Sequence, residues 1–520
     1  MPLGRSRIDI KTVPARGRSL PPQPFDVMVV IGGFNWGPMN QATVVADFAD
    51  AYKKFGDLLS TYEAQLQLKL FFEAGGRRAV GIRVCHITDH SLGSTPDSAA
   101  KASYTLLTES GGTYDEVSTL LVEALYYGTL TLKVKVQDAS NGEAARFDLL
   151  VYRGTERVEW FRNLSMLDSD DRYVEDIVNT SSEKSEYIRV TDQDVGGTLG
   201  LATDQRPVTL DAAVTLTGGD DGMTSVDDND YIGAAAYNTG LYALNLVADG
   251  DLLISPDNTS TTFQNAAISY CEDTKQGKVL FIPDIPANTL TKDAVVTQAQ
   301  LLTASESRTG ILWPRVKIAN PSKTVYGKAP QITVCPSGMY CGRIATNSEK
   351  EETKQFTQPG NEVYGLLDAA VELETDLVLE PTVRDYVTDY KVNPIVKGIR
   401  GVDGNFGVWV DDVLLGKTSD NFVSIGEAHG VSYLRKQFET YLQRHRTQGN
   451  TQQRRYTIED AFKAELVQWT SRNCFASSKA SEAFYVDADP KGESLNNPAV
   501  QDAQMLKVLV AIATARPGRF

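Results

Sequence analysis

At 520 residues, the chain is longer than one hydrophobic core usually supports, so its length predicts two to four domains. The formal net charge of −16 argues against general nucleic-acid binding, because such a surface repels phosphates. No apolar run approaches the roughly 20 residues that a membrane helix needs. The basic N-terminal stretch lacks the apolar segment of a secretory signal, so we expect a protein folded in a cytoplasm.

The five cysteines and four histidines form no pattern that is typical of a metal site. No two cysteines stand in a CxxC pair, and no histidine falls into a ligand cluster with them. The sequence therefore predicts no metal, no cofactor and buried free thiols. The odd number leaves open an intermolecular disulfide if the protein ends up outside a cell. The cysteines are Cys85, Cys271, Cys335, Cys341 and Cys474.

Both ends of the chain are basic, although the whole chain is acidic. The first eighteen residues carry five cations and one acid, and the last twenty carry three cations and one acid. Residues 1–24 lack apolar periodicity and end in a proline-rich stretch, which predicts an extended arm and a stiff linker. Such ends could dock on acidic surfaces of neighbouring copies, or they could be solvated tails.

Residues 25–100 predict the first half of an α/β domain. The continuous apolar run 26–34, closed by glycines, is typical of a strand buried on both faces. Two amphipathic helices follow, and the second ends at Gly75. The alternating segment 79–84 predicts the next strand. A strand, helices and a strand make a crossover unit, so we expect the two strands to pair in parallel.

Residues 101–216 have a different pattern, with short segments that alternate between apolar and polar residues. This pattern predicts a mostly antiparallel β insertion with one helical interruption near 171–179. Its most regular stretch is 130–136, where one face is apolar and the other polar.

The α/β pattern resumes after the glycine-rich stretch 218–222, with helices predicted over 262–275 and 293–305. Each of these helices leads into an apolar strand. The β-rich segment therefore interrupts a split α/β domain that comprises residues 25–100 and 217–363.

Residues 364–520 predict a third, α/β region with two strong helices, around 427–446 and 457–474. The chain closes with an apolar run of strong β character, 505–515. A strand in this position has unpaired backbone groups unless it joins a sheet, so it is a candidate for pairing with another subunit.

Three short motifs are similar to parts of known active sites, but each lacks the context that the chemistry needs. GGDDG at 218–222 is similar to a diguanylate cyclase signature, but no other cyclase element accompanies it. GGRR at 75–78 closes a helix and opens a strand, whereas phosphate cradles follow a strand and open a helix. Ser337 lacks the GxSxG context of a serine hydrolase, and neither His429 nor His445 has a recognisable acid partner. We therefore expect a non-enzymatic protein, although scattered carboxylates could still pair in space.

Several stretches, in order, resemble the contractile bacteriophage tail sheath family. IGGFNWGPMNQATVVADFADAYKKFG, followed by LFFEAGGRRAVGIRV, resembles the N-terminal block with its G-P-x-N and F-F-x-N-G-G motifs. LTGGDDGMTSVDDNDYIG is similar to the junction L-x-G-G-x-D-G and the following D-Y-x-G. TGILWPRVKI, CPSGMYCGRIATN and GNFGVWVDDVLL resemble later motifs, with departures at Trp313, Cys341, Asn347 and Val410. The matching blocks cover about residues 25–85 and 216–520.

The resemblance implies a structural subunit. In this family, subunits form hexameric rings stacked helically around a rigid tail tube, and the sheath contracts to drive the tube through the host envelope. It also implies that extended N- and C-terminal arms add strands to a sheet in neighbouring subunits. The partners would be other copies, the tube, the baseplate and the tail terminator, without direct nucleic-acid contact or membrane insertion. The particle would be a virion tail assembled in the host cytoplasm.

The resemblance and the sequence pattern together nominate three sets of interface residues. For the third of these sets, a basic patch on the C-terminal helices, the alternative is a solvated helix face. The N-terminal arm would use Arg5, Arg7, Ile8, Ile10 and Val13. The C-terminal strand would use Leu506, Val508, Val510 and Ile512. A basic patch facing the tube would comprise Arg435, Lys436, Arg444, Arg446, Arg454 and Arg455.

Two alternatives stay open at this point. One is the sheath of a capsid-less contractile particle, a tailocin or injection system, which the sequence does not separate from a phage tail. The other is a soluble hydrolase with scattered carboxylates, which predicts monomers or small oligomers rather than polymers. A single chain of this length argues against the two-protein sheaths of type VI secretion.

Overall fold

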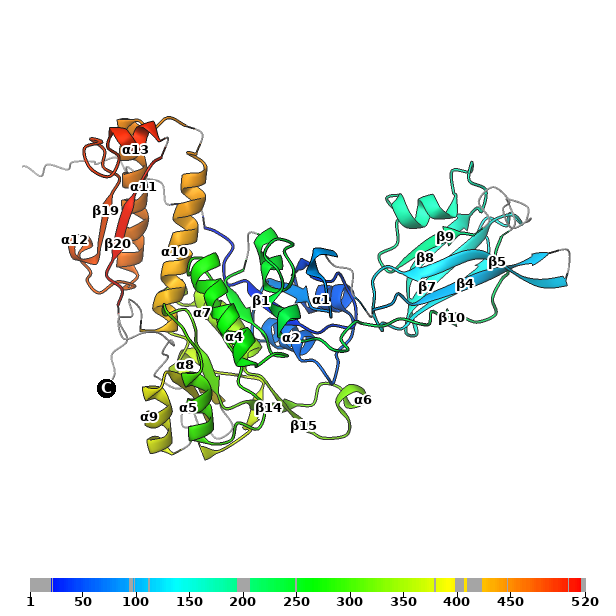
Figure 1. Cartoon of the computed structure of the whole chain (residues 1–520), viewed down its shortest axis with the longest axis horizontal. Coiled ribbons are helices and arrows are strands. Elements are labelled where there is room, and N and C mark those ends of the chain that lie inside the picture. Colours follow the sequence, from blue (N-terminus) through cyan, green and yellow to red (C-terminus); the bar gives the residue numbers. More distant parts are fainter. Residues whose placement is uncertain are drawn as a thin grey trace, which may run out of the picture.

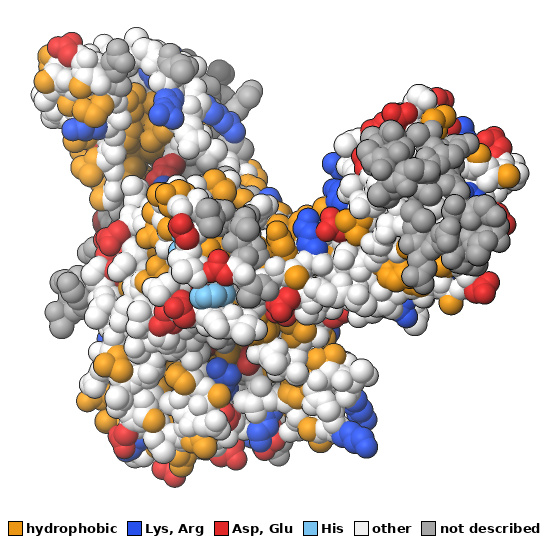
Figure 2. Space-filling view, turned by 45° about the vertical axis from the view of Figure 1, so that its right-hand side comes forward, with side chains coloured by type: hydrophobic (Ala, Val, Ile, Leu, Met, Phe, Trp, Pro, Cys, Tyr) orange, Lys and Arg blue, Asp and Glu red, His pale blue; other side chains and the backbone are white. Residues whose placement is uncertain are grey.

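The chain folds into three parts (Figure 1): a central α/β body (residues 27–92 and 217–408), a β-rich unit (residues 101–216) and a helical lobe (residues 423–515). The β-rich unit and the lobe extend from opposite sides of the body, and Figure 2 shows the β-rich unit projecting away from it. The structure is a computed structural model, and it describes residues 20, 22–92, 97, 99–110, 113–193, 206–247, 250–377, 380–397, 406–408, 423–446, 448–503 and 505–515.

The main sheet of the body contains five strands in the order β12-β11-β1-β3-β2. These strands span Met28–Gly32 (β1), Ala42–Val45 (β2), Ala79–Arg83 (β3), Leu252–Ile254 (β11) and Leu280–Phe281 (β12). β1, β3, β11 and β12 are parallel, which confirms the predicted crossover pairing, and β2 is antiparallel to β3. One sheet thus combines strands from before and after the β-rich unit. β1 is buried along its whole length, as its continuous apolar run predicts.

Helices α2 (Ala64–Glu73) and α7 (Ser337–Lys350) pack against each other and against this sheet. α1 (Phe48–Phe55) begins where the Asp47 side chain accepts a hydrogen bond from the backbone amide of Asp50. The predicted helix 262–275 is α4 (Thr261–Ser269), which continues as one π-helical segment, η4 (Tyr270–Thr274). The predicted helix 293–305 is shorter in the structure, where α5 spans Lys292–Gln300. Beyond its end, the amide of Thr303 donates a hydrogen bond to the Asn265 side chain instead of to a helix carbonyl.

Two smaller sheets complete the body. β13 and β17 pair in parallel and β18 is antiparallel to β17, while β14 lies between β15 and β16. These strands span Ile311–Trp313 (β13), Val316–Ala319 (β14), Gln331–Val334 (β15), Ala370–Leu373 (β16), Val392–Lys397 (β17) and Phe406–Val408 (β18). Short helices cover Asp228–Ile232 (α3), Lys323–Tyr326 (α6), Asn361–Tyr364 (α8) and Pro381–Asp389 (α9). The 3-10 segments are His90–Leu92 (η1), Gly240–Leu246 (η3) and Lys354–Phe356 (η5).

The β-rich unit consists of two sheets that share one hydrophobic core, and its strand pairings among the described residues are antiparallel, as predicted. The predicted helix near 171–179 is instead a π-helical segment, η2 (Asp176–Thr180). One sheet has the order β4-β5-β9 and the other β10-β6-β7-β8. The strands span Ser103–Ser110 (β4), Thr113–Ala124 (β5), Leu132–Asp138 (β6), Phe147–Arg153 (β7), Glu156–Leu164 (β8), Ile188–Asp192 (β9) and Val214–Thr215 (β10).

Arg83 joins the β-rich unit to the body. Its side chain is fully buried at the end of β3 and donates to the carbonyl oxygens of Gly37 (2.9 Å), Tyr127 (2.7 Å) and Asp221 (2.9 Å). Tyr127 lies in the loop between β5 and β6 of the β-rich unit, and Asp221 lies on the stretch that leads from β10 back to the body. Burial lowers the pKa of Arg83 to about 10, so the guanidinium stays charged at neutral pH.

The lobe is built on two long antiparallel-running helices, α10 (Ile425–Gln443) and α11 (Gln452–Ser471). Both begin earlier than predicted. α10 starts after Ser424, which forms a capping box with Glu427, and α11 starts after Thr451, which caps the amide of Arg454. Thr457 therefore lies inside α11, where its hydroxyl donates to the Gln453 carbonyl. The remaining elements are Ala480–Ala483 (α12), Phe484–Asp487 (β19), Pro498–Asp502 (α13) and Leu509–Ile512 (β20).

Candidate assembly interface

The lobe ends in a two-stranded sheet that is a candidate site for strand exchange. β19 and β20 pair antiparallel, with Phe484 opposite Ile512 and Asp487 opposite Leu509. The predicted C-terminal strand is therefore present, and here it pairs within its own chain. Its residues Leu506, Val508, Val510 and Ile512 share one face, which packs against the core of the lobe.

The opposite face of this sheet exposes apolar side chains. Tyr485 on β19 is 56% exposed and Leu509 on β20 is 48% exposed. Tyr456, Val467 and Met505 are further exposed hydrophobic residues of the lobe, and Figure 2 shows hydrophobic side chains gathered on it. A two-stranded ribbon is marginally stable alone, and an exposed apolar face is suited to burial against another surface.

One edge of β20 points away from β19. The Ala513 amide donates to the Ala483 carbonyl, so Ala513 and every second residue before it present their backbone groups to the β19 side. The backbone groups of Val510 and Ile512 therefore face outward. Among the described residues, no strand pairs with this edge. Such a row of donors and acceptors is a template for a strand from another chain.

The N-terminal connector (residues 20–26) enters the same lobe. Leu20 is buried between α10 and α11, where its amide donates to Glu465 (2.9 Å) and its carbonyl accepts from Gln437 (3.3 Å). Phe25 packs its ring against His429 and Tyr433 of α10. The predicted arm residues Arg5, Arg7, Ile8, Ile10 and Val13 lie outside the described residues.

The structure divides the predicted basic patch. Lys436 forms an ion pair with the buried Asp251 (3.2 Å), and Arg455 is buried, donating to the Pro490 carbonyl and to Asn450. These two cations hold the lobe together and attach it to the body, so their assignment to an outward patch is wrong.

The other four cations are nearer the surface. Arg435 is half-exposed and is held by Glu439 and by Gln276 of the body. Arg444 and Arg446 are exposed at the turn between α10 and α11, and Arg454 donates to the Gly449 carbonyl beside them (2.6 Å). The structure thus brings three of the six predicted residues together at one end of the lobe.

Carboxylates that are scattered in the sequence do meet at the carboxyl edge of the main sheet, where many α/β enzymes bind ligands. Asp257 follows β11 and accepts hydrogen bonds from the amides of Gly33 (2.9 Å) and Glu63 (2.5 Å). The Glu63 side chain pairs with Arg315 (3.1 Å) and accepts from the Cys335 amide (2.8 Å). The group therefore fixes the starts of α2 and α7 to the sheet.

Asp284, which follows β12, is the neighbouring carboxyl group. One oxygen accepts from the Ser337 hydroxyl (2.5 Å), and the other has no hydrogen-bond partner among the described residues. Burial raises the pKa of Asp284 to about 7, against the hydrogen bond from Ser337 and the charge of Arg315, while Glu63 raises it further. Below this pH Asp284 is neutral and carries no desolvated charge, which suits a packing role at the start of α7.

The pKa of Asp284 predicts a pH-dependent stability. The unfolded side chain loses its proton near pH 4, whereas the folded one keeps it until about pH 7, so the stabilisation is present below pH 4 and is lost as the pH rises through 7. We expect Asp284→Asn to be more stable than the wild type at pH 8, because amide and neutral carboxyl have similar shapes. The melting temperatures of both proteins at pH 5 and pH 8 test this. An unchanged or larger pH dependence in the variant would contradict it.

The turn at 75–78 is a structural corner. Gly75 has φ of 98°, in the left-handed region, and the amides of Gly75 and Gly76 close the end of α2 on Phe72 and Phe71. Arg77 is largely exposed and pairs with Glu349 of α7. The five cysteines are buried free thiols, as predicted. In the described part of the chain no group of His, Cys, Asp and Glu is arranged to hold a metal ion, and no helix has the length and hydropathy of a membrane span.

The whole architecture matches solved tail sheath structures. A sheath tail protein from Listeria innocua superposes with a TM-score of 0.59 at 12% identity, covering 91% of this chain and 90% of that chain. The contracted helical sheath of the anti-feeding prophage gives a TM-score of 0.54 at 13% identity, covering 100% and 98%. The chain has the tail sheath fold. The contracted sheath of an extracellular contractile injection system gives a TM-score of 0.55 at 12% identity, covering 100% and 96%.

The tail sheath fold confirms the resemblance that was drawn from the ordered sequence blocks. No protein-family model and no curated protein sequence matches the chain. The likeness is therefore one of fold, carried by the arrangement of sheets and helices over nearly the whole chain. Sequence reasoning missed Arg83, Asp257 and Asp284, because the partners of each lie more than 40 residues away in the sequence.

Proposed function

We propose that this protein is the sheath subunit of a contractile particle. Copies polymerise as stacked hexameric rings around a tail tube, and the polymer contracts to drive the tube through a cell envelope. The observation that carries this proposal is the β19–β20 sheet, with its outward edge at Val510 and its exposed Tyr485 and Leu509, in a chain with the tail sheath fold. The protein then acts without enzymatic chemistry, because the energy of contraction lies in subunit packing.

Strand exchange is the joint that we propose between subunits. The arm residues Arg5 to Val13 of one copy add a strand along the outward edge of β20 in another, and the strand Leu506–Ile512 takes part in the same sheet. Backbone ladders hold register while linkers absorb rotation, so such a joint survives a rearrangement of the rings. The proline-rich stretch before Phe25 suits a linker of this kind.

The partners follow from the same proposal. They are other copies, a tail tube, a baseplate and a tail terminator, in a particle assembled in the host cytoplasm. Arg444, Arg446 and Arg454, which lie together at one end of the lobe, are the proposed contact with the tube. A phage tail and a capsid-less injection particle are both compatible, since sheaths of injection systems are among the matching structures.

Electron microscopy of the purified protein tests the proposal. We expect striated hollow tubes in negative stain and a fast-sedimenting polymer in the ultracentrifuge. A protein that stays monomeric over a wide range of concentration and salt, or that binds a small ligand as a monomer, would contradict it.

A further inference from the structure

The outward face of the β10-β6-β7-β8 sheet is cationic, although the chain as a whole is acidic. Its strands alternate inward apolar residues of the core with outward residues, and the outward ones on β6 are Lys133 and Lys135. Arg157 and Arg162 on β8 are exposed, and neither forms an ion pair with another described residue. We call Lys133, Lys135, Arg157 and Arg162 the cationic face.

An aromatic side chain organises this face. The guanidinium of Arg162 lies 3.7 Å from the centre of the Trp160 ring, and that of Arg157 lies 4.8 Å from the same ring. Trp160 is held in turn by Asp148, which accepts its indole N–H (2.9 Å). Burial raises the pKa of Asp148, but hydrogen bonds from Ser140, Asn163 and Trp160 outweigh it and keep the pKa below the ordinary value. The two arginines are therefore preorganised on a fixed platform.

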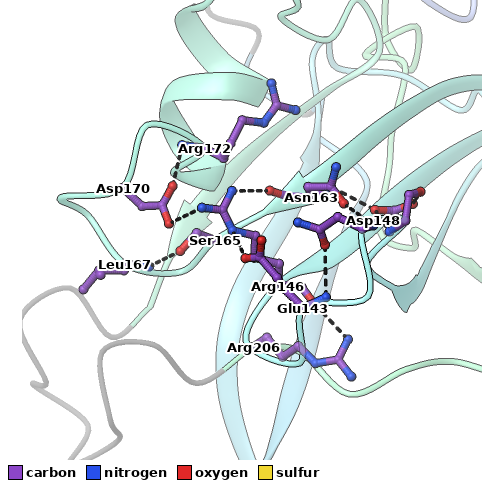
Figure 3. Close-up of polar contacts among 11 residues, drawn as sticks. Glu143, Arg146, Asp148, Asn163, Ser165, Leu167, Asp170, Arg172 and Arg206 are labelled. Atoms are coloured by element: carbon purple, nitrogen blue, oxygen red, sulfur yellow. Dashed lines mark hydrogen bonds and ion pairs between the residues drawn. The ribbon is translucent and has the colours of Figure 1, made fainter.

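An acidic turn lies next to the cationic face, beyond the end of β8. Figure 3 shows Arg146 pointing into this turn, where it pairs with Asp170 (3.0 Å) and donates to the Asn163 carbonyl (3.3 Å). Arg146 thus neutralises Asp170 and fixes the loop. Two further acids of the turn and one at the start of η2 are exposed, and we call these three the acidic turn: Asp168, Asp171 and Asp176.

We propose that the cationic face of one copy binds the acidic turn of the β-rich unit in a neighbouring copy, a head-to-tail contact between projecting units of the polymer. The inference rests on the proposed sheath function, which brings copies side by side. In a head-to-tail contact, each unit binds one neighbour through its cationic face and another neighbour through its acidic turn. Such a contact therefore repeats from copy to copy along a ring or helix. Both patches belong to the same chain, so every copy supplies both halves of the contact.

The geometry disfavours two other uses of this face. An extended polyanion that lies across the sheet would meet Asp168 and Asp171 at its rim, where like charges repel it. Strand addition at β8 is opposed by Arg172, which donates to the edge carbonyl of Arg162 (2.7 Å) while pairing with Glu183. Side-chain pairing with an acidic turn needs neither a long anion nor a bare strand edge.

The contact is expected to operate only within a polymer. Exposed ion pairs are individually weak and are screened by salt, so two free units stay apart. Subunits already tethered by other joints raise the effective concentration of the two patches, and the weak contact then adds to polymer stability. The contribution of this contact to polymer stability is expected to fall as the salt concentration rises.

A charge swap tests the inference in the full chain. We expect the Arg157→Glu/Arg162→Glu variant to raise the critical concentration for tube formation about tenfold at low salt, measured by sedimentation. Adding Asp168→Lys/Asp171→Lys to the same chain is expected to restore it, because the swapped patches again attract. Lys323→Glu/Lys328→Glu changes the net charge equally at exposed sites on and beside α6 and serves as the control, expected to polymerise like the wild type.

Each result decides the inference. Wild-type tubes with an unaffected Arg157→Glu/Arg162→Glu variant would overturn it while leaving the sheath function standing. A rise in critical concentration equal to that of the control variant would also overturn it. So would a failure of Asp168→Lys/Asp171→Lys to restore tube formation. So would unchanged tubes combined with lost binding to heparin, which would mark a polyanion site. A wild type that forms no tubes would refute the sheath function and the inference with it.

Discussion

Replacing Arg83 with methionine is expected to lower the free energy of unfolding by about 3 to 5 kcal/mol. The substitution leaves the carbonyl oxygens of Gly37, Tyr127 and Asp221 buried without their donor. Each unsatisfied buried acceptor costs roughly 1 to 3 kcal/mol, and methionine fills the space without replacing any of the three bonds. Urea denaturation followed by tryptophan fluorescence measures the loss.

The same variant is expected to loosen the β-rich unit. Tyr127 lies in the loop between β5 and β6, and Asp221 lies on the connection from β10 back to the body, so limited proteolysis should cut near 126–128 and 218–222 before it cuts elsewhere. Arg77→Met is the matched control, since Arg77 is 76% exposed by its side chain and makes one surface ion pair. A loss below 1 kcal/mol for Arg83→Met, or equal losses for both variants, would show that Arg83 is not the clamp.

Replacing Val510 with proline is expected to weaken tube formation strongly while leaving the monomer folded. The amide of Val510 faces the outward edge of β20, so proline removes a donor that serves only an added strand. The variant loses one hydrogen bond to the added strand, and the proline ring collides with that strand. Together these effects should raise the critical concentration for tube formation at least about tenfold, which corresponds to about 1.4 kcal/mol. Ultracentrifugation measures the critical concentration, and circular dichroism checks the fold.

Ala511→Pro is the matched control for this experiment. Its amide faces β19, so the substitution breaks the ladder within the chain and is expected to lower the melting temperature of the lobe. Val510→Pro keeps this ladder and loses only part of the packing of Val510 against the core of the lobe, so it should lower that melting temperature less than Ala511→Pro does. Normal tubes from Val510→Pro would refute strand addition at this edge. These point variants are sharper than deletion of residues 507–520, because the deletion also removes Val508, Val510 and Ile512 from the core of the lobe.

Much of the scaffold could be predicted from local sequence pattern. The buried strand at Met28–Gly32, the corner after α2 and the alternating C-terminal strand each follow from periodicity and glycine placement within a few residues. The predicted starts of α10 and α11 are too late, because an apolar stripe marks the buried face of a helix and the first turn lies outside it. The caps Ser424 and Thr451 set the true boundaries.

The long-range groups could not be predicted. Lys436 and Arg455 look like surface cations on a helix, and only the tertiary fold shows that Asp251 and the Pro490 carbonyl bind them. The pairing of Asp257 with Gly33 after β1 and with Glu63 before α2 also depends on segments some 200 residues apart. The intrachain partner of β20 escaped prediction for the same reason, since a lone apolar strand does not specify which edge it joins.

A helical reconstruction of the assembled protein by cryo-electron microscopy tests the central claim most directly. We expect a hollow polymer in which the β19–β20 sheet of each copy is extended along the Val510 edge by a strand from another copy. A polymer in which this edge carries no strand from another copy would contradict the proposed joint, and a protein that forms no polymer would contradict the sheath function itself.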